Sequence, residues 1–204
     1  MIALDRFYPI VENADWVGRI VGAGARLVQL RAKDLSPDEA RREIVAARDI
    51  CAAAGAQLVV NDYWALAIEE RCDFVHLGQG DLDTADIHAL YAAGIRLGVS
   101  THDHAELQRA LALDPDYIAL GPIYPTLLKQ MPFAPQGLER IGEWKSLIGE
   151  RPLVAIGGLT IERARLALAA GADSAAVVTD IVRAADPQAQ TRAWLAALDT
   201  PAES

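Results

Sequence analysis

The stretch AGAQLVV at residues 54–60 decides the fold, because an Ala-Gly pair that ends an alanine-rich segment is followed directly by a short apolar run. The same order recurs around Gly24, Gly94 and Gly171. The intervals between successive glycines of the set Gly24, Gly55, Gly94 and Gly171 are 31, 39 and 77 residues. A glycine just past a helix end adopts the left-handed conformation without a steric penalty, so these glycines are predicted to end helices. A helix-then-strand unit at this spacing predicts a parallel sheet built from βα repeats.

Eight apolar runs are predicted strands: 7–11, 26–31, 57–60, 73–77, 95–99, 116–120, 152–156 and 173–178. Helices are expected between them. The clearest is 36–54, where Ser36 is the predicted N-cap, Pro37 takes the first helical position and Glu39 the third. Another helix is expected to begin near 101–103.

The strands are apolar almost throughout, which is typical of a sheet covered by helices on both faces. Eight such units predict a single (β/α)8 barrel over residues 1–198, with a frayed tail at 199–204. A doubly wound open sheet is the alternative, although no Gly-x-Gly-x-x-Gly motif follows the first strand.

The composition excludes several classes of protein and partner. The 204-residue chain is 52% hydrophobic and 23% charged, which is ordinary for a globular enzyme and too apolar for a disordered chain. Its 19 Lys and Arg against 28 Asp and Glu give a net charge of −9. That sign argues against nucleic acid or an anionic membrane as a partner, because both need a basic patch. An anionic ligand would have to be held by a local cluster of donors or by a metal.

The sequence also predicts a cytoplasmic protein. No apolar stretch approaches the roughly 18–20 residues that span a bilayer, and Asp5 and Arg6 lie where the apolar part of a secretory signal would be. Cys51 and Cys72 make no disulfide framework and lack metal-ligand spacing, so both are expected to be buried thiols. The oligomeric state stays open, a homo-oligomer included.

Polar residues follow nearly every predicted strand, at the carboxyl end that faces the active site in barrel enzymes. Asp62 and Asp81 follow adjacent strands, so both carboxylates could reach one Mg²⁺, which takes one or two protein carboxylates with phosphate oxygens and water. Each Asp could equally cap a helix. Arg31, Lys33 and Lys129 place positive charge at the same rim, which suits a highly charged phosphate group, although a lone surface lysine is more often simply solvated.

Gly157-Gly158 and the turn at Val178-Thr179 follow the seventh and eighth strands. Loops in these two places often form a phosphate site from backbone N–H groups and helix N-termini, and Thr160 and Thr179 could cap the following helices. The alternative is that the paired glycines only end a strand tightly. The irregular segment 121–136 contains four prolines, follows the sixth strand and is predicted to be a lid.

The histidines give weaker signals. His76 ends a strand and is expected to be a satisfied core residue, whereas His88, His102 and His104 are expected at the surface. No Ser-His-Asp or Cys-His arrangement can be assembled from them, and strand 116–120 has no lysine for Schiff-base chemistry. Class I aldolase chemistry, which needs such a lysine, is therefore not expected.

Taken in order, the strand exits resemble those of the thiamine-phosphate synthase family. The matching segments are VQLRAKD (28–34), VND (60–62), HLGQGDL (76–82), GVSTHD (98–103), GPIYPT with Lys129 (121–129), AIGGL (155–159) and GAD…VVT (171–179). They span nearly the whole chain, and their common order and spacing carry the resemblance, since each alone is a weak motif.

The resemblance implies a (β/α)8 transferase that joins 4-amino-2-methyl-5-(diphosphooxymethyl)pyrimidine to a thiazole phosphate, giving thiamine phosphate and pyrophosphate. It implies Mg²⁺ held by Asp62 and Asp81, and catalytic roles for Lys33, Ser100 and Lys129. The residues implied to hold the pyrimidine diphosphate are Gln29, Leu30, Arg31, Ala32, Lys33, Asn61, Ser100 and Lys129. Those implied to hold the thiazole phosphate are Thr126, Gly158, Val178 and Thr179.

One departure from the family pattern concerns the loop that commonly reads Pro-Thr-x-Thr/Ser-Lys. Here Leu128 stands at the second hydroxyl position, which removes a hydrogen bond worth on the order of 1 kcal/mol, and Thr179 replaces a usual serine. Two rivals remain, a thiazole tautomerase on the same barrel and a non-catalytic regulator that binds thiamine phosphate. The tautomerase needs neither Mg²⁺ nor a diphosphate site, and the retained charged residues at the rim disfavour both rivals.

Overall fold

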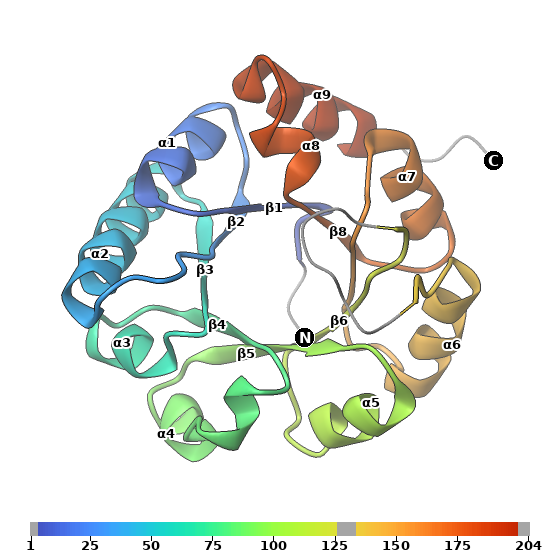
Figure 1. Cartoon of the computed structure of the whole chain (residues 1–204), viewed down its shortest axis with the longest axis horizontal. Helices are drawn as coiled ribbons and strands as arrows, with labels where there is room; N and C mark the ends of the chain where they lie inside the picture. Colours follow the sequence, from blue (N-terminus) through green and yellow to red (C-terminus); the bar gives the residue numbers. More distant parts are fainter. Residues whose placement is uncertain (1–3, 126–133, 200–204) are drawn as a thin grey trace.

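The computed structural model describes residues 4–125 and 134–199, and in this part of the chain eight parallel strands close into one barrel in the order β1 to β8. Helices alternate with the strands and surround them as an outer ring (Figure 1). The predicted single (β/α)8 barrel is confirmed. The strands are β1 (Phe7–Val11), β2 (Leu27–Leu30), β3 (Gln57–Asn61), β4 (Phe74–Leu77), β5 (Arg96–Thr101), β6 (Tyr117–Leu120), β7 (Leu153–Ile156) and β8 (Ser174–Val177). Each coincides with a predicted strand to within two residues.

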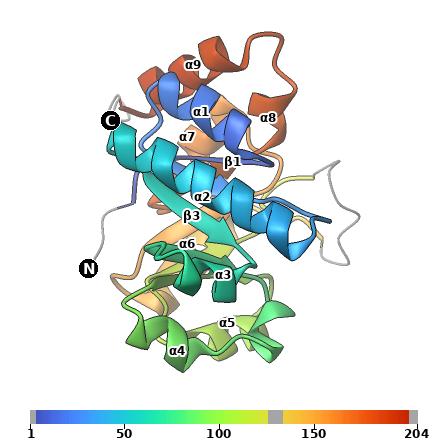
Figure 2. The same cartoon turned by 90° about the vertical axis from the view of Figure 1, so that its left-hand side faces the viewer.

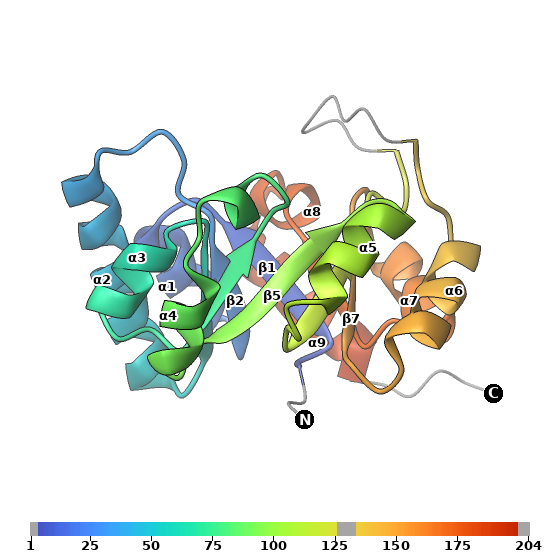
Figure 3. The ribbon, with the colours of Figure 1, turned by 90° about the horizontal axis from the view of Figure 1, so that it is seen from below.

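The helices cover the outside of the barrel, with α1 and α2 side by side (Figure 2). Seen from the side, the strands run obliquely inside this cover (Figure 3). The α-helices are α1 (Ala14–Gly22), α2 (Pro37–Ala54), α3 (Trp64–Glu69), α4 (Ile87–Ala92), α5 (His104–Leu111), α6 (Glu139–Ile148), α7 (Ile161–Ala169), α8 (Thr179–Val182) and α9 (Pro187–Asp199), and a 3-10 turn covers Asp81–Asp83.

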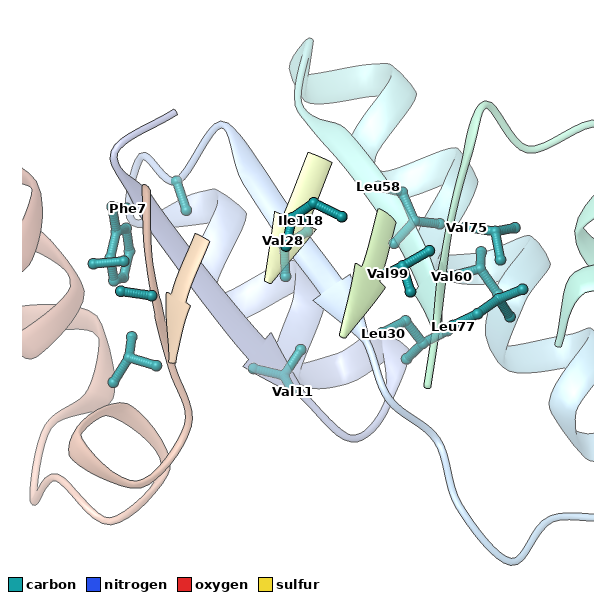
Figure 4. Packing of buried hydrophobic residues seen from close by; sticks show 14 of the residues in the cluster. Phe7, Val11, Val28, Leu30, Leu58, Val60, Val75, Leu77, Val99 and Ile118 are labelled. Atoms are coloured by element: carbon teal, nitrogen blue, oxygen red, sulfur yellow. The ribbon is translucent and has the colours of Figure 1, made fainter. Parts of the chain in front are cut away.

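Two apolar layers hold these elements together. Side chains that point outward from the strands pack against the helices and form the larger layer (Figure 4), which includes Phe7, Val11, Val28, Leu30, Leu58, Val60, Val75, Leu77, Val99 and Ile118. Side chains that point inward fill the barrel, among them Tyr8, Ile10, Leu27, Val59, Phe74, Tyr117, Ala119, Val154 and Ala176. Because both faces of each strand are buried, the strands are apolar almost throughout, as the sequence indicates.

The predicted helix signals are present in the structure. Ser36 caps α2 with a complete capping box, in which Glu39 bonds back to the Ser36 backbone. Gly55 ends the same helix in the left-handed conformation, with φ of 66°. The helix expected near 101–103 begins slightly later, because β5 continues to Thr101 and Asp103 is the N-cap of α5.

The seam of the barrel joins its first and last strands. Tyr8 of β1 lies opposite Ala176 of β8. The hydroxyl of Ser174 donates to the carbonyl of Asp5 at 2.7 Å, at the face where the strands begin. On the same face Arg6 Nη1 donates to the carbonyl of Leu198 at 3.2 Å. The two ends of the described chain are therefore bonded together, away from the strand exits.

Both cysteines are buried and free, as expected, and burial raises the pKa of each thiol to about 11. None of the helices in the two described ranges is long and apolar enough to cross a bilayer.

Candidate active site

Five polar side chains inside the barrel form one continuous series of hydrogen bonds, which we call the interior network. Gln29 Nε2 donates to the Tyr8 hydroxyl at 2.9 Å, and the hydroxyl oxygens of Tyr8 and Tyr117 lie 3.0 Å apart. The Tyr117 hydroxyl lies 2.7 Å from His76 Nδ1, and His76 Nε2 lies 2.8 Å from Ser100 Oγ. The five residues come from β2, β1, β6, β4 and β5, so the network crosses the barrel. Two predicted site residues, Gln29 and Ser100, are its two ends.

Burial keeps the three ionisable members of the interior network, Tyr8, His76 and Tyr117, neutral near neutral pH. Desolvation lowers the pKa of His76 to about 4, although the charge of Asp81 opposes this shift. Desolvation also raises the pKa of the Tyr8 and Tyr117 phenols above their ordinary value. Burial disfavours the charged form of each group, so His76 is an uncharged imidazole and both tyrosines keep their protons. His76 is the satisfied core residue that the sequence predicts.

The buried His76 is expected to make the fold acid-sensitive. Between its folded pKa of about 4 and its ordinary value of 6.5, the unfolded chain binds a proton that the folded chain does not. Its contribution to stability is therefore complete above the ordinary value and is lost as pH falls toward the folded one, by up to about 3 kcal/mol. Urea unfolding at a series of pH values measures this loss. A pH slope no steeper in the unaltered protein than in His76→Gln would contradict the prediction.

A glycine in β5 makes room for the central tyrosine of the network. A Cβ at Gly98 would lie 2.1 Å from Cζ of Tyr117, closer than any real contact. The Tyr117 ring stacks on His76 with an interplanar angle of 13° and meets the edge of Phe74 at a centroid distance of 5.4 Å. The missing side chain at position 98 thus lets the phenol reach both Tyr8 and His76.

Asp62 and Asp81, the predicted metal ligands, lie close together after β3 and β4. The pKa of Asp62 is raised first by burial and then by the neighbouring Asp81 carboxylate, with Lys33 opposing both. Lys33 Nζ is 3.8 Å from Asp62 Oδ2, and Asp81 Oδ2 accepts the backbone N–H of Gly78 at 2.9 Å. Asp62 has φ of 65°, and the helix that follows has its N-cap at Tyr63 without a side-chain hydrogen bond. The helix-cap alternative is therefore wrong for Asp62, while Asp81 does bond locally to its own turn.

The donor set fits Mg²⁺ bound together with a phosphorylated ligand. Within residues 4–125 and 134–199 no group of three or more His, Cys, Asp or Glu could hold a metal, so this part of the chain offers no complete protein cage. Two carboxylates, with phosphate oxygens and water completing the shell, are a usual protein contribution to a Mg²⁺ site. Asn61, the last residue of β3 and the one before Asp62, has a buried Nδ2 without a hydrogen-bond partner among the described residues. A buried donor without a partner is costly, so this amide indicates a ligand acceptor at the carboxyl end of β3.

The residues at the exit of β2 alternate between buried and exposed side chains. Arg31 and Lys33 are exposed at the rim, with half of the Lys33 side chain accessible. Leu30 and Ala32 instead pack in the layer between sheet and helices, so these two could contact a ligand at the mouth only through their backbone. Thr126 and Lys129 lie outside the described residues, as does Leu128.

Gly157 and Gly158 follow β7 and contact the segment that follows β6. Both have positive φ, and a Cβ at Gly158 would lie 2.5 Å from the carbonyl oxygen of Pro125. The backbone N–H of Tyr124 donates to the carbonyl of Gly157 at 3.1 Å. Arg163 Nη1 donates to the carbonyl of Gly158 at 2.7 Å, and its guanidinium lies over the Tyr124 ring. The paired glycines thus anchor the start of the predicted lid, a role that neither sequence interpretation contains.

The turn after β8 differs in one respect from expectation. Val178, not Thr179, is the N-cap of α8, and Thr179 is the first helical residue, so the predicted cap at Thr179 is wrong. Thr160 does cap α7, since its hydroxyl accepts the backbone N–H of Arg163 at 3.4 Å. Gly158, Val178 and Thr179 are all half-buried at the same end of the barrel.

Comparison with known proteins decides the family. Residues 7–181 match the model of the thiamine monophosphate synthase family. The chain belongs to the thiamine monophosphate synthase family. A relative from Rhizobium etli named thiamine-phosphate synthase is 60% identical over 194 residues, which cover 95% of both chains. A relative of the same name from Neisseria meningitidis serogroup B is 51% identical over the same length and coverage.

Solved structures agree with this membership at the level of the fold. A thiamine phosphate pyrophosphorylase from Pyrococcus furiosus superposes with a TM-score of 0.84 at 24% identity, over 95% of both chains. An orotidine 5'-phosphate decarboxylase from Pyrococcus horikoshii superposes with a TM-score of 0.69 at 14% identity. Proteins named for different chemistry share the barrel, so the fold alone does not assign the reaction.

The structure adds residues that sequence reasoning did not connect with the site of this family member. Tyr8 and Tyr117 join Gln29 to His76, and the available signal was Gly98, since a glycine inside a strand often marks a close approach. Among the other histidines, His88 and His104 are exposed as expected. His102 is half-buried and bonded to Glu106, so its predicted surface position is only partly right.

Proposed function

We propose that this member of the thiamine monophosphate synthase family condenses 4-amino-2-methyl-5-(diphosphooxymethyl)pyrimidine with a thiazole phosphate, in a Mg²⁺-dependent reaction that releases pyrophosphate. The observation that carries the proposal is the cluster of Asp62, Asp81 and Lys33 beside the unpartnered amide of Asn61. Two carboxylates, a cation and a free donor together suit a metal-bound diphosphate. The names of the 60% and 51% identical relatives support the same reaction.

The leaving diphosphate is the group that these residues are proposed to act on. Asp62 and Asp81 would hold Mg²⁺, which when bound offsets the negative charge that develops as the C–O bond breaks. Lys33 and Arg31 at the β2 exit, with Lys129, would bind the phosphoryl oxygens. Ser100, at the same end of the barrel, would donate a hydrogen bond to the diphosphate.

The pyrimidinylmethyl cation left behind is delocalised into the electron-rich aminopyrimidine, and the thiazole nitrogen attacks it. No strong general base is required, which is consistent with a neutral, fully bonded His76. Gly158, Val178, Thr179 and Thr126 would place the thiazole phosphate. Exclusion of water matters because solvent would quench the cation.

A lid over the site would exclude water, and the described ends of segment 121–136, the predicted lid, are consistent with this role. The backbone N–H of Gln136 donates to the carbonyl of Pro122 at 2.8 Å, and that of Gly137 donates to the carbonyl of Ile123 at 3.0 Å. The two ends of the segment are thus bonded to each other at the mouth of the barrel. Its middle, 126–133, lies outside the described residues.

Product formation tests the proposal directly. Purified protein is incubated with both phosphorylated precursors, first with Mg²⁺ and then with excess EDTA, and thiamine phosphate and pyrophosphate are quantified. We expect the two products in equal amounts with Mg²⁺ and none with EDTA. Folded protein that binds a precursor by calorimetry without forming product would instead favour the tautomerase or the binding protein. Product formation that is unchanged by EDTA would remove Mg²⁺ from the proposal.

A further inference from the structure

The interior network has a direction, because each tyrosine hydroxyl and the neutral imidazole have a single hydrogen to donate. Gln29 Nε2 can only donate, so the Tyr8 oxygen accepts from it. Tyr8 is buried, and Tyr117 is the partner left for its own proton, so Tyr8 donates to Tyr117. Tyr117 in turn has His76 Nδ1 as the acceptor for its proton. An unpaired buried hydroxyl would be costly, so each step fixes the next.

The direction determines the tautomer of the histidine. Nδ1 of the neutral His76 accepts from Tyr117, so the imidazole proton must be on Nε2. His76 Nε2–H then donates to Ser100 Oγ across 2.8 Å. Ser100 has one of its lone pairs occupied in this way, and its own proton is free to point toward the mouth. The Ser100 backbone is held as well, because Gln79 Nε2 donates to its carbonyl at 2.8 Å.

We infer that Tyr117 and His76 are positioning residues that hold the Ser100 hydroxyl as a hydrogen-bond donor toward the departing diphosphate. This inference rests on the proposed function. The opposite arrangement, with Ser100 donating to His76, would turn a lone pair of Ser100 toward an anionic oxygen, which is repulsive. The network therefore presets the only orientation of Ser100 that stabilises developing negative charge, and no reorganisation is needed during the reaction.

The first test reads the tautomer and does not depend on turnover. Nitrogen-15 NMR of the histidine-labelled full chain, with the His76 signal assigned by comparison with His76→Gln, distinguishes Nε2–H from Nδ1–H. We expect His76 to be neutral and in the Nε2–H form at neutral pH. The Nδ1–H form would reverse the direction of the network and overturn the inference, even if the protein makes thiamine phosphate.

The second test asks whether Tyr117 acts through Ser100. Tyr117→Phe keeps the ring and removes only the hydroxyl, and we expect kcat to fall roughly tenfold with little change in KM. In a Ser100→Ala background the same change is expected to lower kcat by less than about twofold, because the group being oriented is already gone. A full further tenfold loss there would mean that Tyr117 acts independently of Ser100, and would overturn the inference.

Tyr91→Phe is the matched control for these variants. The Tyr91 hydroxyl donates to the carbonyl of Leu113 at 2.7 Å on the outside of the barrel, so its loss removes one hydroxyl far from the network. Thermal unfolding of each variant reports folding separately from rate. If Tyr117→Phe does not fold, the His76 tautomer measured by NMR in the unaltered chain alone decides whether the inference holds. If the unaltered chain forms no thiamine phosphate, the proposed function fails while the tautomer result still stands.

Discussion

Asp62→Asn is expected to lower turnover by at least about a hundredfold and, at neutral pH, to raise the free energy of unfolding of the metal-free protein. Burial and the Asp81 carboxylate raise the pKa of Asp62, so its charged form is less favourable in the folded state than in the unfolded one. Asparagine removes this charge and readily adopts the left-handed conformation found at position 62. Turnover falls in the proposed mechanism because the metal loses a ligand.

A lower turnover together with a higher free energy of unfolding distinguishes the loss of a metal ligand from misfolding, which would lower both. Urea unfolding without metal measures the increase in the free energy of unfolding. This increase should disappear at low pH, where the Asp62 carboxyl of the unaltered protein is protonated in both the folded and the unfolded state. Added Mg²⁺ with pyrophosphate should stabilise the unaltered protein more than the variant, by linkage. Unchanged turnover and unchanged Mg²⁺ dependence in Asp62→Asn would exclude this residue as a ligand.

Asp81→Asn should lower turnover similarly, because the amide oxygen can still accept the N–H of Gly78 while the charge is lost. Asp83→Asn provides the matched control on the same 3-10 turn. Asp83 is exposed and paired with Arg109 at the surface, where a salt bridge contributes little. A loss of turnover as large in Asp83→Asn as in Asp81→Asn would point to a disturbed turn instead of a lost metal ligand.

Gly98→Ala is expected to destabilise the barrel by about 3 kcal/mol or more, the upper range for overpacking a filled core. The added methyl group would overlap Tyr117, whose ring is fully buried between Phe74 and His76, so the ring could shift only by disturbing these neighbours. Chemical denaturation measures the loss. Because the tyrosine would be displaced from the interior network, turnover should fall as well.

A double-mutant cycle identifies the cause of that loss. Leucine at position 117 lacks the ring atoms that the new methyl group would meet, so Gly98→Ala should cost little in a Tyr117→Leu background. Gly142→Ala in α6 is the matched control, because the nearest atom to its Cβ is 4.0 Å away. Alanine inside a helix is expected to stabilise by roughly 0.5–1 kcal/mol relative to glycine. An equal cost of Gly98→Ala in both backgrounds would show that the clash with Tyr117 is not responsible.

The strands and the gathering of polar residues could be predicted because both depend on local signals. The Ala-Gly pairs mark helix ends wherever they occur, and the carboxyl ends of parallel strands must meet at one face. Asp62 and Asp81 are therefore predicted to lie close together. Whether Asp62 is a helix cap or a metal ligand depends on its backbone conformation, which sequence patterns do not specify.

The interior network could not be predicted for a different reason. Tyr8 and Tyr117 are 109 positions apart, and their contact depends on both pointing inward from strands that are not neighbours. A shift of one residue in either strand would turn the hydroxyl toward the helices. The sequence contains the tyrosines and the glycine that admits one of them, but the pairing follows only from the register of the closed sheet.

The seam between β1 and β8 also has a consequence for how the chain is made. Its Ser174–Asp5 hydrogen bond joins residues 169 positions apart, so β1 leaves the ribosome long before its last partner exists. At roughly 5–20 residues per second, that wait is on the order of ten seconds or more. Throughout it, the nascent β1 keeps an unpaired apolar edge, which is a template for pairing with other chains. A sheet that has no edge when complete is therefore most vulnerable to aggregation during synthesis, and any truncation that removes β8 makes that vulnerability permanent.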